Sequence, residues 1–144
     1  MALGGHFYSG GDNQWQLTGR KLTQNDPQYR PFQGMLSELH ARYARPLLIS
    51  ETGAENDQRL PWFDYICAQV SKAVMAGVPV QGICWYPILD YPGWDDARYC
   101  PAGLLGYADN QGQRAAFHPL HKALCDRASE FDTLIRQNDG NAPI

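Results

Sequence analysis

The chain has 144 residues, 44% of them hydrophobic and 19% charged, with a net charge of −3 at pH 7. This size and composition allow one globular domain with its own core. The scattered lysines and arginines exclude the basic stripe of a nucleic-acid surface. No apolar run reaches the roughly 20 residues that span a bilayer, and no signal-peptide pattern opens the chain. We therefore expect a soluble cytoplasmic protein with no nucleic-acid or membrane partner.

The N-terminal part predicts a strand followed by a helix. We expect residues 2–30 to contain the tail of a strand that ends in His6-Phe7-Tyr8, and then a loop. Pro31 suits the first turn of a helix, which we predict over residues 31–44. Its expected buried face, at helical spacing, is formed by Phe32, Met35, Leu36, Leu39 and Tyr43.

The next predicted strand, residues 46–51, ends in a carboxylate. Leu47 to Ile49 is a short apolar run of the kind found in strands buried on both faces of a parallel sheet. Glu51 then falls at the C-terminal end of the strand, where open α/β sheets and α/β barrels place their chemistry. A solvated charge that opens a loop is the simpler alternative for an isolated glutamate.

A βαβ unit follows from the order of the next elements. We predict a helix over residues 61–76, with Pro61 in its first turn and Gly77 at its end. A second apolar strand is predicted over residues 80–86.

The C-terminal third is expected to hold a long functional loop and a helix. Residues 87–117 show no helical period, and their richness in Trp, Tyr, Pro and Gly favours an ordered, functional loop. Within it, Asp109-Asn110-Gln111-Gly112 predicts the turn of a small hairpin. We predict a helix over residues 118–136 and a frayed polar tail over residues 137–144.

The cysteines and histidines do not predict a metal site. Cys67 and Cys84 stand in apolar contexts, where a free cysteine acts as a small hydrophobic residue. His118 and His121 share a spacing of three, but no third ligand follows at a recognisable distance.

Three strand ends together resemble the last three strands of a family 1 type β-glycosidase, in clan A of the glycoside hydrolases. They are Phe7-Tyr8, then Ser50-Glu51-Thr52-Gly53, then Cys84-Trp85-Tyr86 with Asp90 and Trp94. The resemblance covers roughly residues 4–125. It implies an α/β fold that is part of a (β/α)8 TIM barrel, about its last three βα units. It also implies part of a retaining, β-glucosidase-like enzyme that hydrolyses O-glycosidic bonds without a cofactor.

The resemblance also implies roles for individual residues. In the family the nucleophile lies in Thr-Glu-Asn-Gly at the end of the seventh strand, and Glu51 stands in that place. Tyr8 would hold this carboxylate in its ionised form, and Trp85 would form the floor of the sugar site. The other expected contacts to the carbohydrate are His6, Asn13, Gln14, Asp90 and Trp94.

Several departures from the family pattern leave the choice of sugar open. His6 and Phe7 stand where the family has an asparagine and a tyrosine, and Gly93 replaces the glutamate before the last tryptophan. The acid/base glutamate, which the family carries in Asn-Glu-Pro, has no counterpart in this sequence. A complete barrel also takes about 250 residues. We therefore expect the chain to need the missing N-terminal part of the barrel or to self-associate, and to be inactive alone.

Two other readings of the sequence remain open. The chain could be a non-catalytic carbohydrate-binding or scaffold module that keeps the aromatic pocket. Alternatively, it is an unrelated small α/β domain in which Glu51 is only a surface charge.

Overall fold

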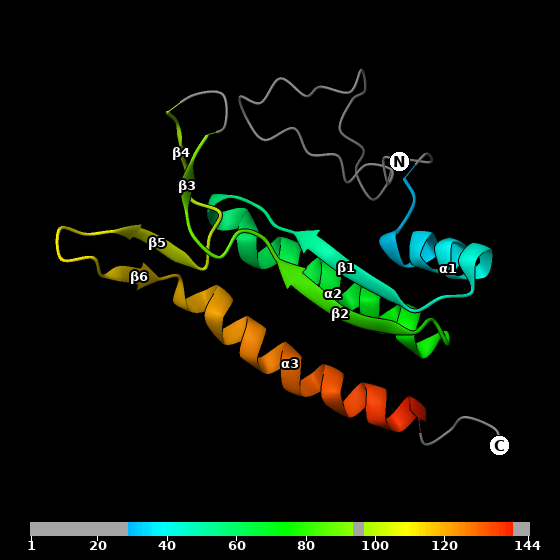
Figure 1. Ribbon diagram of the computed structural model, residues 1–144. Coiled ribbons are helices and arrows are strands. Elements are labelled where there is room, and N and C mark those ends of the chain that lie inside the picture. The colour runs from blue at the N-terminus through cyan, green and yellow to red at the C-terminus, as the bar shows by residue number, and fades with distance from the viewer. Residues whose placement is uncertain (1–28, 94–96, 140–144) are drawn as a thin grey trace.

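The computed structural model describes residues 29–93 and 97–139, and every structural statement below concerns this part of the chain (Figure 1). The elements are, in order, α1 (Phe32–Tyr43), β1 (Leu47–Thr52), the short 3-10 helix η2 (Asn56–Gln58), α2 (Arg59–Met75), β2 (Val80–Trp85), β3 (Tyr91–Pro92), β4 (Tyr99–Cys100), β5 (Leu105–Ala108), β6 (Arg114–Ala116) and α3 (His118–Asp139).

A βαβ unit forms the centre of the structure. β1 and β2 pair in parallel, and α2 connects them and packs behind them (Figure 1). The connection can be tight because Gly77, two residues after the end of α2, has a φ of 85°, in the left-handed region that glycine adopts without strain. The chain then turns directly into β2.

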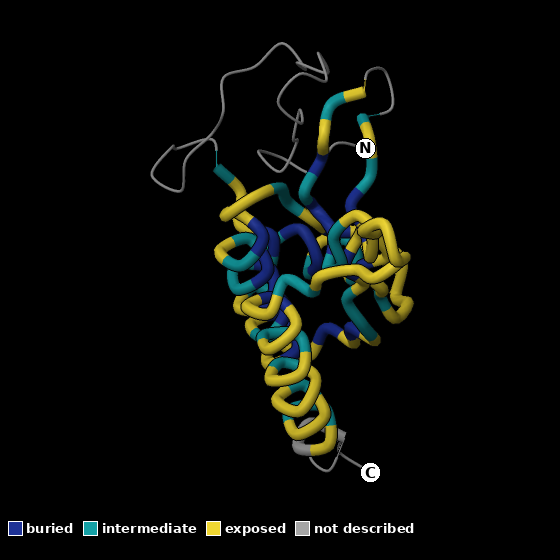
Figure 2. Tube along the Cα trace, turned by 90° about the vertical axis from the view of Figure 1, so that its left-hand side faces the viewer, coloured by how far each residue is buried: buried dark blue, intermediate teal, exposed yellow. Residues whose placement is uncertain are grey.

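The core lies between the two strands and the helices. α1 contributes Phe32, Met35 and Leu36, while Ile49 comes from β1 and Val80 from β2. A second cluster joins α2, the end of β2 and the start of α3, where Leu120 is fully buried. Figure 2 shows the buried residues where helices and strands meet, while most of α3 is exposed along its length.

The other face of the β1–β2 pair is not covered by any described helix. Leu48 on this open face is 57% exposed, and Gln81 and Cys84 on β2 are also exposed. Cys84 therefore does not behave as the buried hydrophobic residue expected from its apolar neighbours. We call this surface of β1 and β2 the open face.

Some boundaries differ from the sequence-based expectation. α2 begins at Arg59, so Pro61 is its third residue, still within the first turn where a missing N–H costs nothing. α3 continues to Asp139, three residues past the expected end. Tyr43, expected on the buried face of α1, is 59% exposed because the helix ends there, at Ala44 in the left-handed conformation.

The segment 87–117, expected as a long loop, contains two short antiparallel pairs. β3 pairs with β4, and β5 pairs with β6. The predicted hairpin turn at Asp109–Gly112 is confirmed, since it connects β5 to β6. Oδ1 of Asp109 accepts the backbone N–H groups of Gln111 and Gln113, both at 2.8 Å, and Gly112 has a φ of 77°.

Among the described helices, none is both long enough and apolar enough to cross a membrane.

Candidate active site

Glu51 lies near the C-terminal end of β1 and is exposed on the open face. Ile49 and Thr52 are buried on the side of α2, whereas Ser50 and Glu51 between them are both exposed. The pairing explains this pattern, because Ile49 lies opposite Ile83 and Thr52 opposite Trp85, with a register shift between them. Strict alternation from Ile49 would turn Glu51 towards α2. One extra residue on β1, as in a β-bulge, turns it to the open face instead.

The end of β1 is fixed by contacts on both sides of Thr52. The Thr52 carbonyl accepts the N–H of Tyr86 at 2.8 Å, and its hydroxyl accepts the indole N–H of Trp62 at 2.8 Å. Gly53 then passes so close to β2 that a Cβ would lie 1.9 Å from the Tyr86 carbonyl oxygen. Only glycine fits there, which explains why the chain has Gly53 two residues after Glu51.

The loop after β1 is tied to the segment after β2. The carboxylate of Glu55 accepts two hydrogen bonds from the Arg98 guanidinium, at 2.8 and 3.2 Å. Arg59 donates to the carbonyls of Asn56, at 3.0 Å, and Gly103, at 2.8 Å, and its guanidinium lies 3.6 Å from the centre of the Phe117 ring. Bidentate ion pairs and buried arginine contacts of this kind restrict loop motion.

Asp90, expected as a partner of sugar hydroxyl groups, accepts hydrogen bonds from within the chain. Its side chain is buried, and its two oxygens accept the N–H of Gly103 and the hydroxyl of Tyr99, each at 2.6 Å. This hydrogen bond to the carboxylate raises the pKa of Tyr99 above its ordinary value. Asp90 thus holds the β3–β4 and β5–β6 segments together.

Trp85, expected as the floor of a sugar site, is a core residue in this structure. Its ring is 7% exposed and makes an edge-on contact with Phe63, at 5.9 Å between ring centres. Its indole N–H donates to the Ala102 carbonyl at 3.1 Å. Since Trp85 is paired with Thr52, it packs on the side of α2, opposite to the open face that carries Glu51.

The remaining expected site residues lie outside the described part of the chain. These are His6, Tyr8, Asn13, Gln14 and Trp94. Some contacts of this region were not predicted from the sequence, namely those of Arg59, Glu55 and Arg98 and the polar contact of Trp62. Only Trp62 carried a usable signal, because a buried indole N–H normally finds an acceptor.

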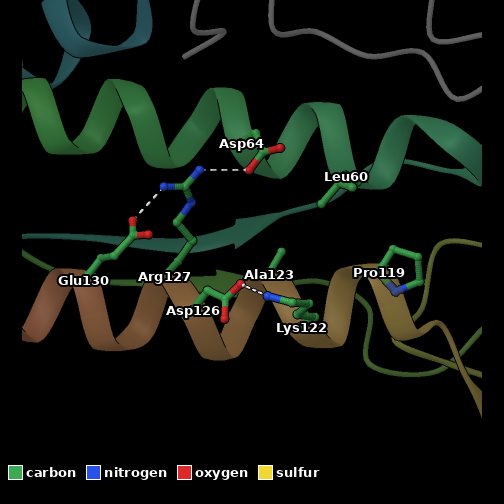
Figure 3. Close-up of a pocket in the computed structure, with 8 residues that line it drawn as sticks. All are labelled: Leu60, Asp64, Pro119, Lys122, Ala123, Asp126, Arg127 and Glu130. Atoms are coloured by element: carbon green, nitrogen blue, oxygen red, sulfur yellow. Dashed lines mark hydrogen bonds and ion pairs between the residues drawn. The ribbon is translucent and has the colours of Figure 1, made fainter.

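Ion pairs line a shallow hollow between α2 and α3 (Figure 3). Arg127 on α3 bridges Asp64 of α2, at 3.1 Å, and Glu130, at 2.6 Å, while Lys122 pairs with Asp126 at 2.6 Å. These charges compensate one another and lie on helices rather than at strand ends. In the described ranges, no three His, Cys, Asp or Glu side chains gather closely enough to hold a metal ion.

The fold matches solved structures of β-glycosidases. The β-glycosidase of Thermosphaera aggregans superposes with a TM-score of 0.57 at 21% identity, over 72% of this chain and 23% of that chain. The family 1 β-glucosidase of Thermotoga maritima gives a TM-score of 0.56 at 19% identity, over 70% and 27% of the two chains. The chain has the fold of a β-glycosidase segment. It spans about a quarter of the length of these relatives.

The likeness to β-glycosidases lies in the fold rather than in overall sequence identity. A structure described as an apo β-glucosidase 1317 matches 85% of this chain, with a TM-score of 0.51 at 18% identity. The sequence itself matches no protein-family model and no curated protein sequence. The resemblance noted in the sequence is therefore confirmed at the level of the fold.

Proposed function

We propose that the chain is the C-terminal part of a retaining β-glycosidase barrel, about its last three βα units, and that Glu51 is the nucleophile. The observation that carries this proposal is the register shift in β1, which turns Glu51 to the open face at the end of a parallel strand. In a closed barrel this face, opposite the helices, is the interior, and the ends of the strands carry the catalytic groups.

The mechanism needs a second carboxyl group from outside the described residues. Retaining glycosidases use two carboxyl groups about 5–5.5 Å apart, one as nucleophile and one as acid and then base. Among the carboxylates in the described segments after β1 and β2, Glu55 is engaged by Arg98 and Asp90 by Gly103 and Tyr99. We therefore assign the acid/base group to the missing N-terminal part of the barrel.

The sugar would bind above the open face. In the reaction, the Glu51 carboxylate attacks the anomeric carbon while the acid protonates the leaving oxygen, and water then releases the sugar from the glycosyl ester. Structures of the Thermotoga maritima β-glucosidase contain glucoimidazole and isofagomine lactam. By this likeness we propose a β-linked pyranoside as substrate. Tyr8, His6, Asn13, Gln14 and Trp94 stay predicted contacts, with Trp85 and Asp90 supporting the wall of the site.

Covalent labelling tests this proposal. The chain is placed in a chimera in which it replaces the matching quarter of the Thermotoga maritima β-glucosidase. The folded chimera is then treated with 2,4-dinitrophenyl 2-deoxy-2-fluoro-β-glucoside, which traps the glycosyl-enzyme. Mass spectrometry of peptides should find the sugar on Glu51 and none in Glu51→Gln, while Glu55→Gln still labels. A folded, hydrolytically active chimera with an adduct elsewhere contradicts the assignment.

A carbohydrate-binding module without catalysis is the second candidate. It is favoured by the engagement of both Glu55 and Asp90 in contacts within the chain. In that case calorimetry on the 144-residue chain should detect sugar binding that survives Glu51→Gln. The nucleophile proposal predicts no hydrolysis by this chain alone.

A further inference from the structure

We propose that the hydrogen bond from Trp62 to Thr52 is the positioning element that keeps Glu51 on the open face. This inference rests on the proposed role of Glu51 and adds two positioning residues to the same site. Neither is proposed to touch the sugar.

The donor is held firmly by the core. Trp62 is in α2, where it packs against both core clusters and lies 5.6 Å from the Tyr65 ring, centre to centre. Its Nε1 donates to the Thr52 hydroxyl at 2.8 Å, and Thr52 is itself buried. Loss of a hydrogen bond at a buried site costs more than the loss of an exposed one, because the remaining group is no longer solvated.

The bond acts on Glu51 through the geometry of the strand. Ile49 is anchored in the core and Thr52 is anchored by Trp62, so both ends of this short stretch face α2. Ser50 and Glu51, which lie between these two inward positions, are both exposed, as expected at a β-bulge, and Glu51 is the one next to the Trp62 anchor. Without the hydroxyl acceptor, Thr52 loses its polar partner on α2, and the end of β1 is free to shift its register.

Hydrogen exchange on the 144-residue chain tests the structural half of the inference. The reporter is the Tyr86 amide, which donates to the Thr52 carbonyl at 2.8 Å. Thr52→Val keeps the size of the side chain and removes the acceptor, and it should lower the protection of this amide at least tenfold. Thr52→Ser should retain it. Thr133→Val, the same change at an exposed hydroxyl on α3, is the matched control and should have no effect.

The labelling rate in the chimera tests the functional half. At saturating 2-fluoro-glucoside, Thr52→Val should label Glu51 at least ten times more slowly, with less than a threefold change in the half-saturating concentration. Thr52→Ser should label within threefold of wild type. Trp62→Phe should slow labelling as Thr52→Val does, and the double variant should be no slower than either single one, because both changes remove the same bond.

The outcomes separate this inference from the proposed function. Wild-type protection of Tyr86 in both Thr52→Val and Trp62→Phe overturns the inference, as does wild-type labelling by Thr52→Val. Slow labelling by Thr52→Ser also overturns it, since a restored hydroxyl should restore the position. If the folded wild-type chimera does not label, the role of Glu51 as nucleophile fails. The exchange data then still decide whether Trp62 holds the end of β1.

Discussion

Single residues at the end of β1 have little freedom to change, and Gly53 is the clearest case. A Cβ at this position would lie 1.9 Å from the Tyr86 carbonyl oxygen, which is backbone and moves only with β2. Gly34, in the first turn of α1, is a contrast, because the nearest neighbour of an added Cβ would be Pro31 Cγ at 3.9 Å.

We expect Gly53→Ala to lower the free energy of unfolding by about 3 kcal/mol, since an overlap with backbone forces β1 and β2 apart. Gly34→Ala should instead raise it by about 0.5–1 kcal/mol, because alanine is the better helix residue. Urea unfolding followed by circular dichroism measures both changes. Equal stability of the two variants would contradict the close approach of Gly53 to β2.

Burial of Cys67 predicts a dependence of stability on alkaline pH. Burial raises the pKa of its thiol from 9.0 to about 12, so the folded chain keeps a proton that the unfolded chain releases. The contribution to stability is complete below pH 9 and is lost as the pH rises towards 12. Cys67→Ala should therefore lose less stability than wild type between pH 8 and 11, measured by urea midpoints. The exposed Cys125→Ala should follow the wild type, and identical curves for all three proteins would refute the assignment.

At the scale of elements, α3 packs on the rest of the chain through an apolar face on which Leu120 is fully buried and Ala123, Leu124, Phe131 and Leu134 are partly buried. Leu120 has 0% exposure in the cluster with Phe63 and Trp85, whereas most of α3 is solvated. The Arg127 pairs with Asp64 and Glu130 join groups that are 36–60% exposed, and such pairs contribute little to stability. The apolar contacts of this face, with Leu120 the most buried, therefore dominate.

We expect Leu120→Ala to destabilise the chain by about 2–5 kcal/mol, because it leaves a cavity between α2 and α3. Leu48→Ala, the same change on the open face, should cost well under half as much. Arg127→Ala should cost about 0.5 kcal/mol. Thermal unfolding of the three variants provides the ranking, and a larger loss for Arg127→Ala than for Leu120→Ala would show that ion pairs hold α3.

Local features and the βαβ unit were predictable from the sequence, and the contacts of single side chains across the fold were not. The hairpin turn at Asp109–Gly112 follows from side chains that bond their own backbone, and the strand that ends near Glu51 follows from its apolar run. The face on which Glu51 lies was not predictable, because the register shift depends on the pairing with β2. Asp90 and Trp85 were expected to face a ligand, but their partners, Tyr99, Gly103 and Ala102, are 9 to 17 residues away.

At the scale of the molecule, the open face and the outer edges of a two-stranded parallel sheet are the dominant feature. Parallel sheets are normally covered on both faces, and free strand edges favour association. Here Leu48 is 57% exposed, and Ile88, just after β2, is 53% exposed. A partner that supplies the rest of the barrel would bury these side chains.

We therefore predict that the isolated 144-residue chain self-associates, and that a charge on the open face weakens this. Leu48→Lys should raise the dissociation constant at least tenfold in sedimentation equilibrium. Tyr107→Lys, at a position of similar exposure on β5, is the control and should have a smaller effect. A wild-type chain that stays monomeric at high concentration would contradict the prediction that the open face drives self-association.

The register shift in β1 has a consequence for how this strand tolerates change over evolution. A substitution at Ser50 changes only the side chain before Glu51. It does not move Glu51 to the other face of the sheet, because two residues still lie between Ile49 and Thr52. Deleting Ser50 would remove the extra residue, so that Ile49, Glu51 and Thr52 alternate regularly; Glu51 would still point to the open face, but without the bend that a bulge gives the end of the strand. The face that carries Glu51 should therefore tolerate a change of length here, whereas the direction in which the end of β1 points should not.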